Sequence, residues 1–500
     1  NWLKDSGLPI DENGRVLTKK TLQVLNYPEL FAVGDCGVIK DYPRPSSGVW
    51  AVRAAKPLAN NLEFITKGLK LEEWKPQRKA IQLLDINIRK KKSKAFISWG
   101  EVIIGPFDFL SSLKELIDKQ FISKFDLVKD INSDMSSEEE MIKCRGCAAK
   151  LAFTPLSSAL KKVDLIESSK DDSMNIGILN SDKTLIQSVD GFPSLISDPW
   201  LNGRLLAFHS CSDIWACGGS VISAQSLINL PSISNNLQQE LLYQVLEGIN
   251  SALTIQGANL IGGHTLESRK ISEEPFSLGI ESSLTVNGVI DDKKYFWPKG
   301  GMRNGDEILI SRSLGTGIIF SAFMNGQVKP YILDNVLKEM NKSQHEIVNY
   351  INQLTNLNPR SKIVNACTDI TGFGLLGHLS EMLESTNSDQ LKMNSEPFKV
   401  TLELDNIPLY DGVKELLDKG FESTLAPANQ IFLKNIDGDK NLRFELTSND
   451  SSSNRSFYNA MLKILVDPQT CGPLVVCCSS IYSEKLIQQG PWIKIGFISE

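Results

Sequence analysis

Short apolar runs and longer runs with helical spacing follow each other along most of the chain. Apolar runs bounded by turn residues predict strands at 15–18, 27–33, 176–179, 184–190 and 258–265. Helical spacing predicts helices at 50–66, 109–125, 153–163, 205–217 and 236–255, and another that opens after residue 369 and runs to 383. A chain of 500 residues with this pattern is expected to form two to four domains.

The pattern changes character between residues 126 and 150. Residues 126–142 are polar and acidic, which is typical of a linker. The segment Cys144-Arg-Gly-Cys-Ala-Ala-Lys150 follows, with two thiols and a lysine separated by small residues. A thiolate is the nucleophilic form of cysteine, and a nearby cation such as Lys150 favours it. We therefore expect 143–168 to contain a mobile segment that carries a soft nucleophile to a site built by the residues after it.

Composition narrows the classes of function. The net charge of -6 and the pI of about 5.6 argue against nucleic acid as the main partner. The basic stretch 89–94 is interpreted as a solvated loop. No run of eighteen apolar residues occurs, and nine scattered cysteines indicate a reduced, cytoplasmic chain without a disulfide framework. The first residue is Asn1 and not methionine, so we expect a fragment of a longer protein.

Acidic residues stand at the ends of several predicted elements: Asp171, Asp172, Asp190, Asp213 and Asp369. Mg²⁺ prefers oxygen ligands, so these carboxylates could share magnesium ions with a triphosphate. Glycine turns at 218–219 and 262–263 would let backbone N–H groups reach phosphate oxygens. No Walker A motif is present. For each acid taken alone, a role as a helix cap, a turn residue or half of an ion pair is equally open.

The first part of the chain carries the run Phe31-Ala-Val-Gly-Asp35, followed by the helix from Gly48. It resembles the second FAD-binding motif of flavin-dependent pyridine nucleotide oxidoreductases of the NADH dehydrogenase type. The resemblance implies that Gly34 and Asp35 contact FAD and that NADH is a reductant. No GxGxxG fingerprint opens a βαβ unit, so only the last part of that family is expected, at 1–125. An ordinary turn at the end of a strand is the alternative.

The remainder, from about residue 143, resembles selenophosphate synthetase (selenide, water dikinase). The resemblance rests on several segments in order: Cys144–Lys150, Lys170–Asp172, Ser188–Asp190, Asp198–Arg204, Ser212–Gly219, Gly262–Thr265, Thr368–His378 and Asp467–Gly472. It implies an α/β fold of the aminoimidazole ribonucleotide synthetase type, with an ATP and Mg²⁺ domain at 169–295 and a second domain at 296–500. It also implies a homodimer that forms a β-barrel from its N-terminal halves.

By the same resemblance, ATP, selenide and water give selenophosphate, AMP and orthophosphate. Cys147 and Lys150 match the catalytic residues of the family, and the matches to its magnesium ligands are Asp172, Asp213 and Asp369. The matches to its nucleotide contacts are Lys150, Ser169, Lys170, Asp171, Asp190, Asp213, Gly262, Gly263, His264 and Thr265.

The chain departs from the family at one point. Many members have a second cysteine just before the lysine, where this chain has Ala149, and the second thiol here is Cys144. A partner role for Cys144 and a spectator role are both open, and half of a zinc site is a weaker alternative. Two other functions are kept: a small-substrate kinase of the same superfamily, and a flavin-dithiol redox protein with a regulatory ATP module.

Overall fold

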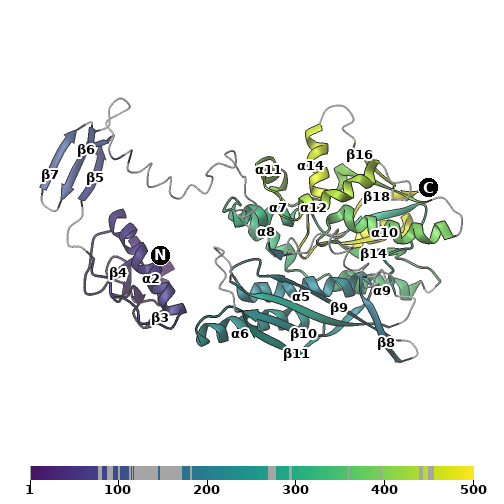
Figure 1. Ribbon diagram of the computed structural model, residues 1–500, viewed down its shortest axis with the longest axis horizontal. Helices are drawn as coiled ribbons and strands as arrows, with labels where there is room; N and C mark the ends of the chain where they lie inside the picture. Colours follow the sequence, from purple (N-terminus) through teal and green to yellow (C-terminus); the bar gives the residue numbers. More distant parts are fainter. Residues whose placement is uncertain are drawn as a thin grey trace. The chain divides into compact units, whose positions relative to one another are not determined.

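The computed structural model describes residues 2–76, 81–86, 94–99, 102–107, 109–111, 114, 116, 145–146, 172–180, 183–268, 278–291, 296–358, 360–392, 397–437, 443–448 and 455–500. Two compact units emerge (Figure 1). The first contains Asn1–Ser136 with Ile233–Leu237, and the second contains Ser137–Ser232 with Gln238–Glu500. In the described part of the chain, no helix is long and apolar enough to cross a membrane.

The first unit is small and built around a four-stranded sheet of order β3-β2-β1-β4. Its elements are α1 (Trp2–Asp5), β1 (Val16–Thr18), β2 (Gln23–Val24), β3 (Tyr27–Phe31), η1 (Gly34–Cys36), β4 (Gly37–Ile39) and α2 (Gly48–Thr66). A separate three-stranded sheet joins β5 (Ile81–Ile86), β6 (Lys94–Trp99) and β7 (Val102–Phe107) in that order. The predicted strands at 15–18 and 27–33 and the helix at 50–66 are confirmed. Of the predicted helix 109–125, the described residues 109–111, 114 and 116 are helical, and the others lie outside the described residues.

The first half of the second unit is a five-stranded sheet of order β11-β10-β12-β9-β8. Its strands and helices are β8 (Met174–Asn180), β9 (Lys183–Pro193), α5 (Pro199–Ala216), β10 (Ser220–Leu230), α6 (Asn235–Thr254), β11 (Asn259–Glu267) and β12 (Glu281–Ile290). Helix α5 crosses one face of this sheet (Figure 1). Helix α5 begins at Pro199 because two residues favour a helix start there. Asp198 accepts a hydrogen bond from the Leu201 N–H at 2.8 Å, and Pro199 stands in the first turn.

Two local predictions in this half were wrong. Asp190 does not end its strand, because β12 stays paired with β9 as far as Pro193. Gly262 and Gly263 do not form a turn either. They lie inside β11, beside a shift in its register with β10, and Gly263 passes so close to the Ser226 carbonyl that a Cβ atom would overlap it. Gly263 therefore serves strand packing, whereas Gly262 has no atom within 4 Å of an added Cβ and takes a φ of +147°, which favours glycine.

The second half of the second unit is a six-stranded sheet of order β14-β17-β13-β18-β15-β16. Its strands are β13 (Asp306–Ile310), β14 (Ala366–Asp369), β15 (Lys399–Glu403), β16 (Arg443–Thr447), β17 (Leu474–Ser479) and β18 (Ile493–Ser499). Its helices are α7 (Thr316–Met324), α8 (Pro330–Met340), α9 (His345–Leu357), α10 (Gly374–Lys392), η4 (Leu404–Asn406), α11 (Val413–Asp418), α12 (Ala426–Asn429), η5 (Gln430–Leu433), α13 (Lys434–Asp437), α14 (Arg455–Leu465) and α15 (Ser480–Gln489).

Helix α5 joins the two halves of the second unit. Thirteen of its 18 residues are buried, because it contacts β9, β10 and β12 on one side and β14 of the other sheet as well. A helix that is buried nearly all round belongs to the core of a large domain. Its aromatic residues Phe208 and Trp215 are almost fully buried. Polar residues near its C-terminal end therefore lie between the two sheets.

The segment Asp467–Gly472 holds the N-terminal end of α7. The Gln469 Oε1 atom accepts from the N–H groups of Gly315 at 3.0 Å and Thr316 at 3.1 Å. The Asp467 Oδ2 atom accepts from the Ile318 N–H at 3.3 Å and from Gln469 Nε2 at 2.9 Å. These side chains take up donors that a helix start leaves unpaired. The segment thus has a structural role as the cap of α7.

Burial raises the pKa of Asp467 from 3.8 to about 8. Folding therefore takes up a proton between these two values, and the free energy of unfolding falls as pH rises through that window. The expected slope from this one group is about 1.4 kcal/mol per pH unit. We expect Asp467→Asn to remove it, as measured by urea unfolding at several pH values between the two. The exposed Asp334→Asn is the control, and equal slopes in wild type and Asp467→Asn would contradict the assignment.

Candidate active site

Three carboxylates from separate elements meet between the two halves of the second unit. Asp172 precedes β8, Asp213 lies in the last turn of α5, and Asp369 ends β14. One ligand atom from each lies within 4.8 Å of the others. The sequence predicted these three acids as magnesium ligands, and the structure brings them together. The arrangement depends on α5, because that helix contacts both sheets.

Neighbouring hydroxyl groups orient two of these acids. The Ser188 hydroxyl on β9 donates to Asp213 Oδ2 at 2.5 Å, and the Ser212 hydroxyl on α5 donates to Asp369 Oδ2. Both serines belong to the segments quoted for the family resemblance, but no role was predicted for them. The signal was available, since each lies within two residues of a candidate acid. Such contacts hold a carboxylate in one rotamer before a ligand arrives.

Burial and mutual repulsion make the cluster electrostatically unfavourable without a cation. Burial, followed by the charges of Asp369, Asp190 and Asp172, raises the pKa of Asp213 well above its usual value. Burial also raises the pKa of Asp172 to about 6, although Lys299 opposes the effect. A hard divalent cation would offset this repulsion, and carboxylate oxygens are the ligands it prefers. The three acids therefore fit a Mg²⁺ site.

Comparison with known proteins places this geometry in a family. Two family models match: AIR synthase related protein, N-terminal domain, over residues 170–289, and AIR synthase related protein, C-terminal domain, over residues 303–416. A selenide, water dikinase of Clostridioides difficile is 28% identical over 357 residues, covering 70% of this chain and 90% of the relative. Selenide, water dikinase 2 of Peptoclostridium acidaminophilum is 30% identical over 349 residues, covering 67% of this chain and 86% of that protein.

The chain belongs to the selenide, water dikinase family. It is an enzyme of that class, and the predicted resemblance of its larger part is confirmed. The two family models also confirm the predicted two-domain fold of the AIR synthase type. Among solved structures, a thiamine monophosphate kinase from Aquifex aeolicus is 16% identical, covers 69% of this chain and 94% of its own, and has a TM-score of 0.47.

In the dikinase-related unit, Asp190 lies on the same side of the sheet as α5. Its Oδ1 atom accepts from the Gly191 N–H at 2.7 Å, and its Oδ2 atom lies 3.0 Å from Nε2 of His209 on α5. The other ring nitrogen of His209 accepts from the Cys471 N–H at 3.4 Å. His209 thus connects the predicted nucleotide ligand Asp190 to the segment that caps α7, a role that the sequence did not indicate.

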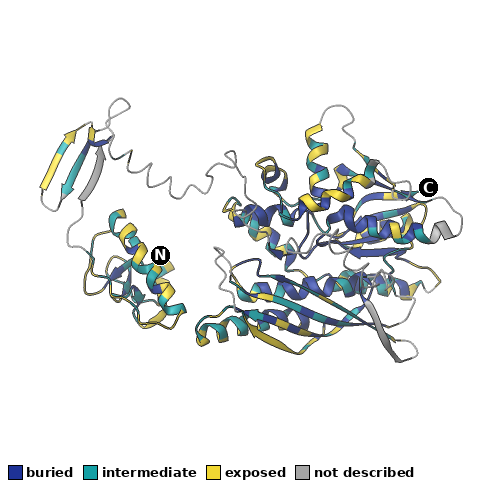
Figure 2. Cartoon of the chain, in the orientation of Figure 1, coloured by how far each residue is buried: buried dark blue, intermediate teal, exposed yellow. Residues whose placement is uncertain are grey.

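The predicted nucleotide contacts Gly262, Gly263, His264 and Thr265 lie away from the acids within one chain. They belong to the edge strand β11, and β10 and β12 separate this strand from β9. Three strand spacings amount to about 14 Å. All four residues are exposed (Figure 2). One copy of the chain does not bring these residues to the acid cluster.

The predicted catalytic residues Cys147 and Lys150 and the predicted nucleotide contacts Ser169, Lys170 and Asp171 lie outside the described residues. Their neighbour Gly146 is described, with a φ of +65° that favours glycine. A Cβ atom on Gly146 would come within 2.6 Å of Thr470 Oγ1 and 3.1 Å of Leu195 Cδ1. The backbone at Gly146 therefore lies close to Thr470 of the segment Asp467–Gly472, which also contacts His209.

A second group of charged residues flanks the acids, and the sequence did not predict it. Lys299 Nζ lies 2.5 Å from Asp172 Oδ1 and 3.0 Å from Glu381 Oε2. Burial alone favours the neutral amine, but the adjacent carboxylates keep the pKa of Lys299 well above its usual value. The Thr368 hydroxyl donates to the same oxygen of Asp172 at 3.3 Å. Lys299 lies in the segment between the two family domains, where no periodic pattern marks it.

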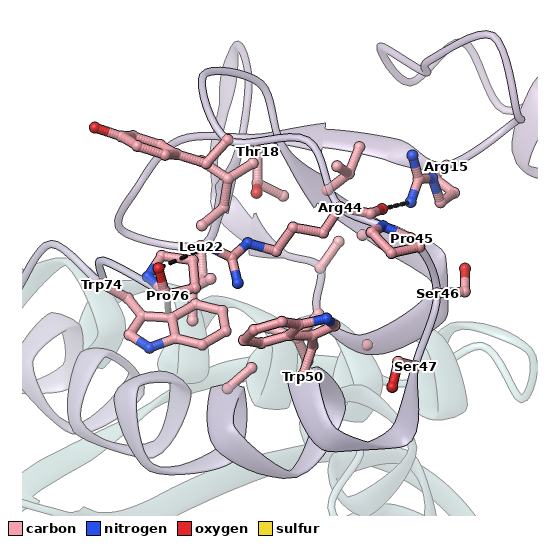
Figure 3. A pocket seen from close by; sticks show the side chains of 18 residues that line it. Arg15, Thr18, Leu22, Arg44, Pro45, Ser46, Ser47, Trp50, Trp74 and Pro76 are labelled. Carbon is pink, nitrogen blue, oxygen red and sulfur yellow. Dashed lines mark hydrogen bonds between the residues drawn. The ribbon is translucent and has the colours of Figure 1, made fainter. Parts of the chain in front are cut away.

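The first unit contains an enclosed hollow next to the predicted FAD motif (Figure 3). The guanidinium of Arg44 lies over the Trp50 ring at 4.2 Å and donates to the Pro76 carbonyl at 2.6 Å. The remaining cavity volume is about 40 Å³, which holds a few water molecules. A flavin ring does not fit there with Arg44 in place. Asp35 instead lines an adjoining open hollow of about 610 Å³.

Proposed function

We propose that residues 143–500 catalyse ATP-dependent synthesis of selenophosphate from selenide, with AMP and orthophosphate as the other products. The observation that carries the proposal is the meeting of Asp172, Asp213 and Asp369 in a chain of the selenide, water dikinase family. A cluster of carboxylates that can hold a divalent cation suits a reaction in which charged phosphoryl groups are transferred.

In this proposal Asp172, Asp213 and Asp369 hold Mg²⁺. When bound, Mg²⁺ neutralises phosphate charge and helps to orient the triphosphate. Ser188 and Ser212 keep two of the carboxylates in place through the hydrogen bonds already described. Asp190, held by His209, faces the same space and is assigned to the nucleotide.

The thiol segment supplies the selenium chemistry in this proposal. Selenide and the thiolate of Cys147 are both reduced nucleophiles, so Cys147 is assigned to the approach of selenide and no bond between sulfur and selenium is proposed. Lys150 offsets the negative charge of the phosphates as the nucleophile approaches. The contact of Gly146 with Thr470 supports a position for this segment at the boundary of the two halves.

The outer face of the five-stranded sheet supports a homodimer. Val189, Leu227 and Leu266 are exposed there, on the face opposite α5, and line a hollow of about 600 Å³. His264 pairs in register with Leu227, so it lies on the same face. Contact between two copies through this face would bring Gly262–Thr265 next to another copy. We assign these four residues to ATP binding only in the dimer.

Leu227→Asp tests this interface. A charge at the centre of an apolar contact is costly to bury, so we expect the variant to be monomeric where wild type is dimeric. The measurement is sedimentation velocity over a range of protein concentrations. Tyr331→Asp on α8 is the matched control, because Tyr331 is 57% exposed and Leu227 is 46% exposed. A dimer that survives Leu227→Asp would place the interface elsewhere.

The nucleotide product decides between this function and a kinase of the same superfamily. We expect AMP and orthophosphate in equal amounts when ATP, Mg²⁺ and anaerobic selenide are supplied, as quantified by ion-exchange chromatography. A simple kinase would release ADP instead, and ADP as the accumulating nucleotide would overturn the proposal. Omission of selenide provides the background.

The hollow beside Arg44 and Trp50 has a volume of about 40 Å³, and no step of the reaction is assigned to FAD or to NADH. The oxidoreductase resemblance of 1–125 stays a prediction, with Gly34 and Asp35 as its candidate residues. Absorption spectra of the full chain after addition of FAD and gel filtration would test it.

A further inference from the structure

The charges around the acid cluster are unevenly arranged. Asp213 and Asp369 are held by neutral serine hydroxyls, whereas Asp172 contacts a buried ammonium group. The side chain of Lys299 is 11% exposed and that of Asp172 is 6% exposed, so solvent screens this pair only slightly. Any divalent cation that binds the three acids therefore lies close to a positive charge that the protein itself supplies.

The position of Lys299 is fixed from the opposite side. Its ammonium group also contacts Glu381 on α10, and Glu381 Oε2 lies 3.4 Å from Nδ1 of His378. The other ring nitrogen of His378 accepts from the Thr371 N–H at 3.2 Å. Thr371 belongs to the loop that follows Asp369. This chain of contacts returns to the acid cluster, so Lys299 is held between Asp172 and Glu381.

We propose that Lys299 is a built-in counter-cation of the acid site, which lowers its affinity for free divalent metal. The proposal rests on the proposed function, because it takes Asp172, Asp213 and Asp369 as the metal site. One oxygen of Asp172 is shared with the ammonium group and with the Thr368 hydroxyl, so its charge is only partly available to a metal ion. The consequence is a site that binds metal weakly alone and more tightly with the phosphates of the nucleotide.

A purely structural ion pair between the two halves makes a different prediction. Loss of such a pair would loosen the site and weaken metal binding. A counter-cation acts in the opposite direction, because its removal returns the full charge of Asp172 to the metal. At a separation of a few ångströms in a buried site, one unit charge changes metal affinity by about tenfold or more. The sign of the change distinguishes the two roles.

The test is a titration of the full chain with Mn²⁺, without nucleotide, followed by electron paramagnetic resonance of the free ion. We expect Lys299→Met to bind Mn²⁺ about tenfold more tightly than wild type, and Lys299→Arg, which keeps the charge, to bind as wild type does. Lys299→Met leaves Glu381 without its ammonium partner, so the double variant Lys299→Met/Glu381→Gln is measured as well, with circular dichroism as a check of folding. Unchanged or weaker binding in folded Lys299→Met would overturn the proposal, and the double variant, which also loses the charge of Glu381, is expected to fall between wild type and Lys299→Met.

A second variant separates failure of this inference from failure of the proposed function. Asp369→Asn is expected to abolish Mn²⁺ binding at the acid site. If binding is lost in Asp369→Asn and does not tighten in the Lys299 variants, the metal site stands and the counter-cation role is wrong. If Asp369→Asn binds Mn²⁺ as wild type does, the acids are not the metal site, and both proposals are wrong.

Discussion

Replacement of Asp213 by asparagine is expected to reduce ATP turnover by at least about a hundredfold, since loss of a ligand exceeds the usual effect of disturbing its supporting contacts. Asp213 has a ligand atom within 4.8 Å of one from Asp172 and one from Asp369, and burial together with the charges of its neighbours raises its pKa well above the usual value. An amide at this position keeps the shape of the side chain and removes the charge that a cation needs. The measurement is AMP formation over a range of Mg²⁺ concentrations.

Two comparisons make this result specific. Asp198→Asn changes the same residue type at the start of α5, where asparagine caps a helix as well as aspartate does, so wild-type turnover is expected. The thermal stability of Asp213→Asn without metal should equal or exceed that of wild type, because the variant removes a buried charge that its neighbours repel. Normal Mg²⁺ dependence in Asp213→Asn would contradict the assignment of the acid site.

The largest expected effect on stability is at Gly248 in α6. A Cβ atom on this residue would overlap the Trp200 carbonyl of α5, and Gly203 approaches the Val245 carbonyl in the same way. The two helices can pack this closely only because both positions lack side chains. We expect Gly248→Ala to cost about 3 kcal/mol of unfolding free energy, measured by urea denaturation, because backbone must move to admit the methyl group.

Gly48→Ala is the control for this prediction. Gly48 begins α2 and has no atom within 4 Å of an added Cβ, so its replacement should leave stability within about 0.5 kcal/mol of wild type. If Gly248→Ala is as stable as Gly48→Ala, the close packing of α5 on α6 is wrong. Because α5 carries Asp213 and Ser212, loss of this packing should also reduce turnover.

Much of the acid site was predictable from the sequence because its residues stand at the ends of strong periodic elements. The pattern at 205–217 located α5, whereas β14, the short strand that ends at Asp369, was not predicted. The start of α5 at Pro199 depends on the cap at Asp198, and both residues lie before the predicted range 205–217. Local pattern therefore indicated which acids to consider, and the family resemblance indicated how they combine.

The parts that could not be predicted depend on contacts between distant segments. Lys299 has no periodic neighbours, and its role follows only from its contacts with Asp172 and Glu381. The glycines of β11 were predicted to form a turn because the sequence of a single strand does not show that it pairs with β10. The polar stretch 430–456, for which no strand was predicted, contains β16, which forms by parallel pairing with β15. In each case tertiary pairing overrides local preference.

The most direct test of the account is ³¹P NMR of the full chain with ATP, Mg²⁺ and anaerobic selenide, beside the Cys147→Ser variant. The account predicts a selenophosphate signal with matching AMP and orthophosphate in wild type, and loss of the selenophosphate signal in Cys147→Ser. ADP without selenophosphate, or an undiminished selenophosphate signal in Cys147→Ser, would contradict it.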